Sequence, residues 1–159
     1  MRRQSPHKKP LEIGSSSYRE GAQERIQDAL VLLKQGRLTL SVYAAGCAVE
    51  GMLRSLIASN SREFDERHDL RKFAVRVRDL GLLESELDHG FVADVEGVAR
   101  AWHNLLRFVD EAKLERHYRR IGEFGKRDTL KFVAARHWTK CNRVVKRCGV
   151  LWQRSRQRN

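Results

Sequence analysis

Residues 38–59 read LTLSVYAAGCAVEGMLRSLIAS, the most apolar stretch of the chain. Its apolar side chains recur at spacings of three and four and cover more than one face, as in a helix at the centre of a helical protein. The two charged residues of the stretch, Glu50 and Arg54, stand four apart with the acid first, an order that favours an ion pair along one helix. The stretch therefore predicts a buried central helix.

Helical spacing extends to both sides of this segment. Ser17 and Glu20 form a capping-box pattern in front of a first helix that Gly36 ends. After a polar loop over residues 59–67, Asp69 is expected to cap a third helix, with Gly81 as its stop. No segment alternates polar and apolar residues between turn signals, so strands have no support.

Two further helices are expected in the second half of the chain. One covers about residues 91–109, and after a charged connection Asp128 is expected to cap the last helix. Trp102 and Trp138 lie on the apolar stripes of these helices, so we expect both to be buried with Val49 at the centre of the bundle. The sequence predicts an all-α, up-and-down bundle of four to five helices.

The chain has 159 residues, the length of one ordinary domain. We expect a disordered basic tail over residues 1–14, the bundle over 15–153 and a basic C-terminal tail over 154–159. No apolar run reaches the length of a membrane span, and because no apolar stretch follows the positive charges of residues 1–7, we expect no secretory signal. The three cysteines have no metal-ligand spacing. These features predict a cytoplasmic protein with reduced thiols, without a metal, a cofactor or a membrane partner.

The net charge of +12 is unevenly distributed. Residues 21–125 hold 16 Lys/Arg and 17 acidic residues, whereas residues 126–159 hold 11 Lys/Arg and one acidic residue. A basic stripe is expected along the last helix, formed by Arg136, Lys140, Arg143, Lys146 and Arg147. A phosphate backbone is the usual partner of such a stripe, and an acidic protein or a merely solubilising surface are the alternatives.

Several motifs resemble those of the HEPN family. Residues 41–57, SVYAAGCAVEGMLRSLI, are similar to its second helix, residues 68–70 (His-Asp-Leu) match the opening of its third helix, and residues 80–82 (Leu-Gly-Leu) match the end of that helix. Trp102 followed by Arg107-Phe108 resembles a Trp and an Arg-Tyr near the end of its fourth helix. The resemblance covers roughly residues 15–150. It implies a helical bundle that commonly dimerises, and a metal-independent ribonuclease of a toxin–antitoxin or defence system or a non-catalytic binding module.

Catalytic members of the family carry an Arg, four to six residues and then a His. Arg2/His7 and Arg62/His68 have that spacing here, but neither lies in the fourth helix. With 23 arginines in 159 residues, two matches are no more than chance predicts. The motif of the family is therefore not recognisable in its usual place.

The fourth helix offers another set. Arg100, His103, Asn104 and Arg107 follow each other at i, i+3, i+4 and i+7, which predicts one shared helical face. A histidine can take a proton from a ribose 2′-hydroxyl, and guanidinium groups can hold the phosphate. The alternative is a polar stripe that faces solvent or a second subunit.

His68, with Arg62, is a second candidate, although a histidine at a helix start more often anchors its loop. Glu50 and Arg54 are either an internal pair or a handle for a ligand. Together the residues predict an RNA-directed, HEPN-like module of a prokaryotic defence or toxin–antitoxin system. It would bind RNA through the last helix and cleave it without metal, as a homodimer or in complex with an effector. The alternative is a catalytically silent helical subunit of a larger nuclease or nucleotidyltransferase.

Overall fold

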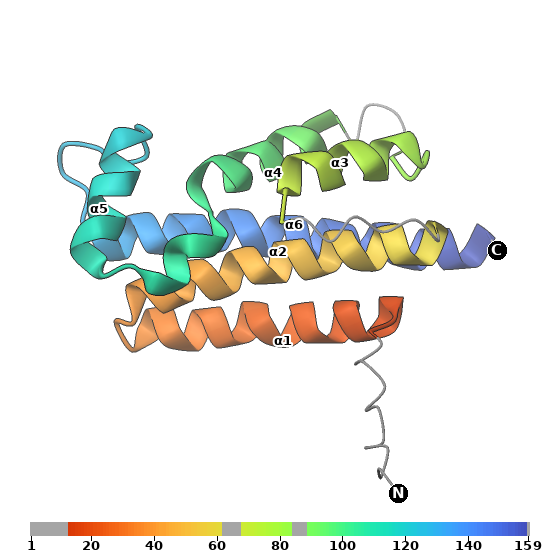
Figure 1. Ribbon diagram of the computed structural model, residues 1–159, viewed down its shortest axis with the longest axis horizontal. Coiled ribbons are helices and arrows are strands. Elements are labelled where there is room, and N and C mark those ends of the chain that lie inside the picture. The colour runs from red at the N-terminus through yellow and green to blue at the C-terminus, as the bar shows by residue number, and fades with distance from the viewer. Residues whose placement is uncertain (1–12, 62–67, 84–88, 159) are drawn as a thin grey trace, which may run out of the picture.

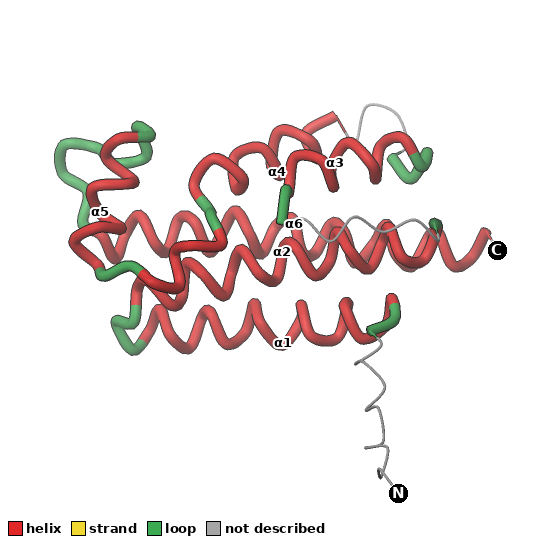
Figure 2. The backbone as a smooth tube through the Cα atoms, viewed as in Figure 1, coloured by secondary structure: helices red, strands yellow, loops and turns green. Residues whose placement is uncertain are grey.

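The computed structural model describes residues 13–61, 68–83 and 89–158. These ranges contain six α-helices and one 3-10 helix, and no strand (Figure 2). The elements in chain order are α1 (Ser15–Lys34), α2 (Leu38–Asn60), α3 (Leu70–Asp79), α4 (His89–Ala101), η2 (Asn104–Phe108), α5 (Glu111–Arg120) and α6 (Leu130–Arg158). The predicted all-α bundle is confirmed.

Three long helices, α1, α2 and α6, lie side by side along the long axis of the molecule (Figure 1). Gly36, at a φ of +74°, makes the turn that sends α2 back along α1. The shorter pair α3 and α4 packs across α2 and α6, and α5 lies at one end. The core runs between these layers and includes Val49 and Trp102, as expected.

Helix α2 is the centre of the bundle because its apolar residues cover most of its circumference. Among the described helices, α2 alone is long and apolar enough to span a membrane by length and composition, although no membrane span is expected from the sequence. However, 78% of its most apolar window is buried inside the bundle. The apolar surface of α2 is therefore covered by the other helices of the bundle.

The predicted capping box at the start of α1 is wrong. The helix begins three residues earlier, at Ser15 after the extended Gly14, and no side chain caps its first amides. The hydroxyl of Ser15 donates instead to the main-chain oxygen of Ser55 in α2, at 2.9 Å. The first side chain of α1 thus makes a tertiary contact and leaves the first amides uncapped.

The region predicted as one helix over residues 91–109 is divided. Helix α4 ends at Ala101, and an extended residue, His103, leads into η2. The expected charged connection contains a further helix, α5, which Asp110 caps through the amide of Lys113 at 2.7 Å. Leu114 and Tyr118 of α5 are fully buried and hold this helix on the bundle.

Helix α6 also differs from expectation at both ends. Thr129 caps it, through the amide of Phe132 at 3.2 Å, in place of Asp128. At the other end the helix continues to Arg158, through residues expected to form a tail. It continues because Trp152 and Ser155 are buried, and the Trp152 indole donates to Ser15 in α1. Trp138, expected in the core, is half-buried and donates to the Ile26 main-chain oxygen.

Candidate functional site

Glu50 and Arg54 form the predicted ion pair on α2. The Arg54 Nε lies 2.7 Å from the Glu50 Oε1, and both side chains are at most 10% exposed. The Arg54 guanidinium also stacks on the Phe73 ring, 4.8 Å from its centroid. Charges buried to this degree need partners, so the pair and its surroundings hold each other in one geometry.

His68 completes this cluster from outside. Its Nδ1 lies 2.8 Å and 3.0 Å from the two Glu50 carboxylate oxygens, while the side chain stays 52% exposed. Because a carboxylate only accepts hydrogen bonds, Nδ1 carries a proton, and in the neutral imidazole Nε2 then presents the lone pair. Asp69 caps α3 immediately afterwards and so fixes the main chain beside His68. The histidine is thus oriented as an acceptor or base at the start of α3.

His103 has the opposite hydrogen-bond pattern. Its Nδ1 accepts from the main-chain amide of Leu105 at 3.1 Å, which caps η2. The Nε2 of His103 therefore carries the proton and is a donor or acid. Its side chain is exposed to solvent. One histidine presents a lone pair and the other a proton, as acid–base catalysis requires.

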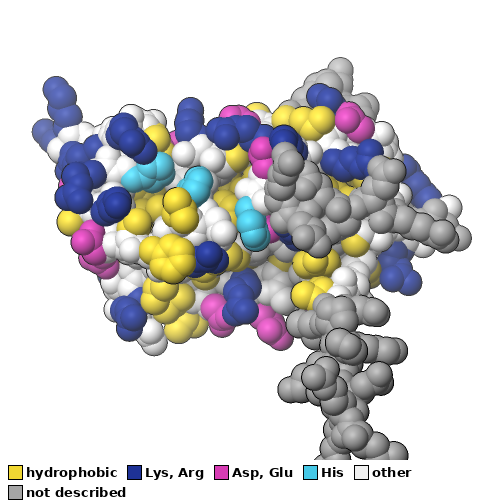
Figure 3. Space-filling view, viewed as in Figure 1, with side chains coloured by type: hydrophobic (Ala, Val, Ile, Leu, Met, Phe, Trp, Pro, Cys, Tyr) yellow, Lys and Arg dark blue, Asp and Glu magenta, His cyan; other side chains and the backbone are white. Residues whose placement is uncertain are grey.

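Both histidines line one pocket of about 490 Å³ between the start of α3 and the end of α4. Arg71, Trp102 and Asn104 contribute to its walls. Arg71 also pairs with Glu96 at 2.7 Å. The face of the molecule in Figure 3 carries exposed histidines among Lys, Arg and hydrophobic side chains. The pocket thus combines two imidazoles, a guanidinium and an aromatic ring.

Trp102 supports the pocket from the core side. Its indole donates to the Tyr43 main-chain oxygen at 3.1 Å and stacks on the Tyr43 ring, with centroids 6.4 Å apart. The ring lies where a side chain on Gly46 would be, since a Cβ there would come within 2.0 Å of the indole. Gly46 therefore makes room for the residue next to His103.

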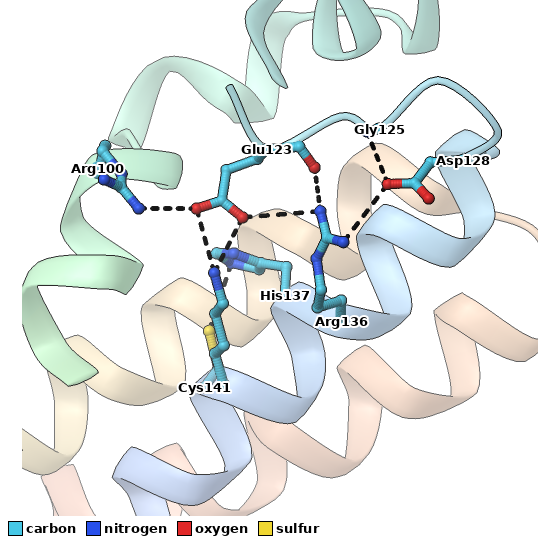
Figure 4. A network of polar contacts seen from close by, with 8 residues as sticks. Arg100, Glu123, Gly125, Asp128, Arg136, His137 and Cys141 are labelled. Atoms are coloured by element: carbon cyan, nitrogen blue, oxygen red, sulfur yellow. Dashed lines mark hydrogen bonds and ion pairs between the residues drawn. The ribbon is translucent and has the colours of Figure 1, made fainter. Parts of the chain in front are cut away.

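The predicted catalytic face of the fourth helix is not formed, because α4 ends before His103. Arg100 points to another part of the molecule and contacts Glu123 at 3.0 Å (Figure 4). Arg107 lies over the Phe108 ring and donates to Asn104 at 3.3 Å. Of the four residues, His103 and Asn104 share the pocket, and His68 joins them. Arg62 lies outside the described residues.

Four residues of the predicted basic stripe contact acids of α4 or of the α5–α6 connection, namely Arg136, Lys140, Arg143 and Arg147. Lys140 contacts Glu123 at 2.9 Å, and Arg136 contacts the Glu123 main-chain oxygen (Figure 4) and Asp128. Asp94 lies 3.6 Å from Arg143 and 3.1 Å from Arg147. Lys146 is exposed. The stripe is therefore not a bare row of cations, and its charge is partly shared with these three acids.

A buried His–Cys pair lies beneath this surface. The Cys141 sulfur is 3.3 Å from His137 Nε2, and both side chains are fully buried. Burial lowers the pKa of His137 to about 4, and the positive charge of Lys140 acts in the same direction. Burial also raises the pKa of the Cys141 thiol. The pair holds a neutral imidazole and an intact thiol, so it provides no thiolate nucleophile.

Two features of the site were not anticipated from the sequence. The contact of His68 with Glu50 joins residues 18 positions apart, and no local pattern indicates it. Helix α5 has a recognisable signal, since Asp110 precedes it and Leu114 and Tyr118 are four apart.

Within the described ranges, no group of three His, Cys, Asp or Glu side chains is placed to hold a metal ion.

The fold and the site together define the class of protein: an all-α bundle with a polar pocket beside its fourth helix. The model of the HEPN domain matches residues 15–137, most of the chain, and the protein belongs to the HEPN family. The comparison with curated proteins gives no match, and neither does the comparison with solved structures.

Proposed function

We propose that this HEPN domain binds RNA and cleaves it in the pocket between His68 and His103, without the help of a metal. The observation that carries the proposal is the complementary state of two histidines in one pocket, one held by a buried carboxylate and the other by a main-chain amide. In line with the family resemblance, we place the activity in a prokaryotic defence or toxin–antitoxin system.

The two imidazoles determine the chemistry. His68 Nε2 takes the proton of a ribose 2′-hydroxyl, and the 2′-oxygen attacks the adjacent phosphorus. The bond from phosphorus to the 5′-oxygen breaks as His103 gives its Nε2 proton to that oxygen. The products are a 2′,3′-cyclic phosphate and a 5′-hydroxyl. Arg71 stabilises the negative charge that builds up on the phosphate oxygens.

The test is incubation of the purified chain with total RNA in the presence of a chelator. We expect cleavage with cyclic phosphate ends, and a loss of at least about 100-fold in rate for His68→Gln and His103→Gln. Lys140→Ala should weaken binding without abolishing cleavage. His117→Gln is the matched control, because His117 lies on α5 and does not line this pocket. Cleavage that survives both pocket variants, or that requires a metal, would contradict the proposal.

The second candidate is a catalytically silent subunit that docks onto a larger nuclease or nucleotidyltransferase, or pairs with a second copy. The exposure of two apolar side chains of η2 favours it, because Leu105 is 58% and Phe108 is 73% exposed. Exposed apolar side chains next to each other are typical of interaction sites. Absence of cleavage, together with an oligomer or complex that Leu105→Glu dissociates, would favour this candidate.

A further inference from the structure

A groove of about 680 Å³ lies between α4 and α6. Small residues form its floor, with Ala93 and Gly97 from α4 and Ala135 and Thr139 from α6. A Cβ added to Gly97 would meet no atom within 4 Å, so the space above it is open. The two helices therefore leave room for a flat or narrow ligand.

Cations surround this floor. Arg100 comes from α4, and Arg136, Lys140 and Arg143 come from α6. Among the described residues, these four cations share three acids, namely Glu123, Asp94 and Asp128. The surplus of positive charge favours an anionic ligand.

Glu123 holds these cations in place. Its side chain is only 11% exposed and contacts Arg100, Arg136 and Lys140. Burial alone would raise the pKa of this carboxyl, but hydrogen bonds and charges from Lys140 and Arg100 outweigh burial and lower it. The carboxylate thus stays ionised and orients Arg100 and Lys140 toward the groove. Figure 4 shows Arg100 and Arg136 approaching Glu123 from opposite sides.

An aromatic ring completes the groove. Phe132, in the first turn of α6, lines it and is 55% exposed, although a ring of this size is normally buried. The Arg136 guanidinium lies 5.6 Å from the centroid of the Phe132 ring. Aromatic rings beside a cationic groove are typical of sites for single-stranded nucleic acid, since unpaired bases stack on the ring while cations hold the phosphates.

We infer that the α4–α6 groove binds a segment of single-stranded RNA, with one base stacked on Phe132 and the following phosphates on Lys140 and Arg143. The choice of RNA over DNA rests on the proposed function. Adjacent residues connect the two sites, because Ala99 lines the histidine pocket and Arg100 lines the groove. A strand held in the groove needs to cross only the last turn of α4 to reach His68 and His103. The groove selects the single strand, and the pocket acts on it.

The first test blocks the groove without disturbing the fold. Gly97→Leu places a side chain in the open space and replaces a helical glycine with a better helix former. We expect its affinity for a labelled 2′-O-methyl uridine octamer, which cannot be cleaved, to fall about tenfold or more. Gly21→Leu is the matched control, since Gly21 is also helical, a Cβ added there would meet no atom within 4 Å, and the residue lies outside the groove. Equal affinity of both variants would overturn the inference.

The second test separates stacking from charge. Phe132→Leu, which keeps an apolar side chain but loses the ring, should weaken octamer binding about tenfold, and Phe132→Trp should restore it. Arg143→Gln should reduce the dependence of log affinity on log salt by about 0.7, the value for one phosphate of a single strand. Lys131→Gln removes one charge from the same helix outside the groove and should leave this slope unchanged. Equal slopes for these two variants would overturn the inference.

The outcomes separate this inference from the proposed function. Octamer binding that depends on Gly97 and Phe132 supports the groove even if the chain cleaves no RNA. Cleavage that depends on His68 and His103, with octamer affinity insensitive to groove variants, overturns the groove and leaves the proposed function standing. If polyglutamate binds in an Arg143-dependent manner and the octamer does not, the groove belongs to an acidic protein and the inference fails.

Discussion

Trp102 occupies the space that a side chain on Gly46 would need, with its indole Cδ1 2.0 Å from the position of a Cβ. The contact joins the centre of α2 to the end of α4. It places the tryptophan ring under the pocket and thereby positions His103 in the next residue.

Gly46→Ala should therefore lower the free energy of unfolding by about 3 kcal/mol, the upper end of the usual cost of overpacking. The ring cannot shift without losing its hydrogen bond to Tyr43. Gly21→Ala is the control and should raise stability by up to about 1 kcal/mol, because its Cβ meets nothing and alanine favours the helix. Urea denaturation of both variants measures the difference, and a neutral Gly46→Ala would contradict this packing.

Arg54→Met should cost about 3–5 kcal/mol of stability, because it leaves the Glu50 carboxylate buried without its closest cation. The double variant Glu50→Leu/Arg54→Met should recover most of this loss, since apolar pairs often replace buried ion pairs at little cost. Chemical denaturation of the single and double variants tests the coupling. Losses that simply add would show that the pair is not a unit.

The stability of the protein should depend on pH through His137. Its pKa of about 4 in the folded state lies below the ordinary value near 6.5, so protons bind the unfolded chain more tightly. This contribution is fully favourable above about pH 6.5 and is lost as the pH falls toward 4. Between pH 7 and pH 5 it should amount to about 2 kcal/mol.

Denaturation of the wild type and of His137→Leu over this pH range measures the effect. The variant removes the titrating group, and the buried Nδ1 that it also removes has no hydrogen-bond partner among the described atoms. We expect a flatter dependence for the variant. Parallel curves for the two proteins would mean that His137 titrates normally in the fold.

A chain that ends at Gln153 should be about 1–2 kcal/mol less stable than the full chain. The truncation removes Ser155, which is 5% exposed, and Arg156, whose guanidinium lies 5.1 Å from the centroid of the Trp152 ring. A chain that ends at Gln157 keeps both residues and is the control. Thermal melting compares the two, and equal melting temperatures would mean that the last turns of α6 contribute nothing.

Much of the fold could be predicted from the sequence. The repeat of apolar residues at three and four determines which face of each helix is buried, and the Glu50–Arg54 pair follows from spacing alone. Glycines 36 and 81 mark the ends of α1 and α3, where both take a positive φ. These properties are local, because they depend on residues at most one or two turns apart.

Less of the candidate site could be predicted. The sequence predicts His103 and Asn104 on the fourth helix, but that helix ends at Ala101, Trp102 packs on Gly46 and His103 caps η2. The basic residues of the predicted stripe lie on α6, whereas the acids that contact them come from α4 and from the connection before α6, which the sequence does not indicate. The periodic spacing of residues along one helix does not indicate which other helix will pack against it.

The sequence by itself determined an all-helical HEPN domain with a buried α2 and a basic last helix, because helix formation and burial depend on local composition and spacing. Only the tertiary structure decided that Glu50 orients His68, that His68 and His103 share a pocket, and that Arg100 turns toward Glu123. Each of these relationships joins residues 18 or more positions apart, and the packing of helices determines such distances, which a linear pattern does not encode.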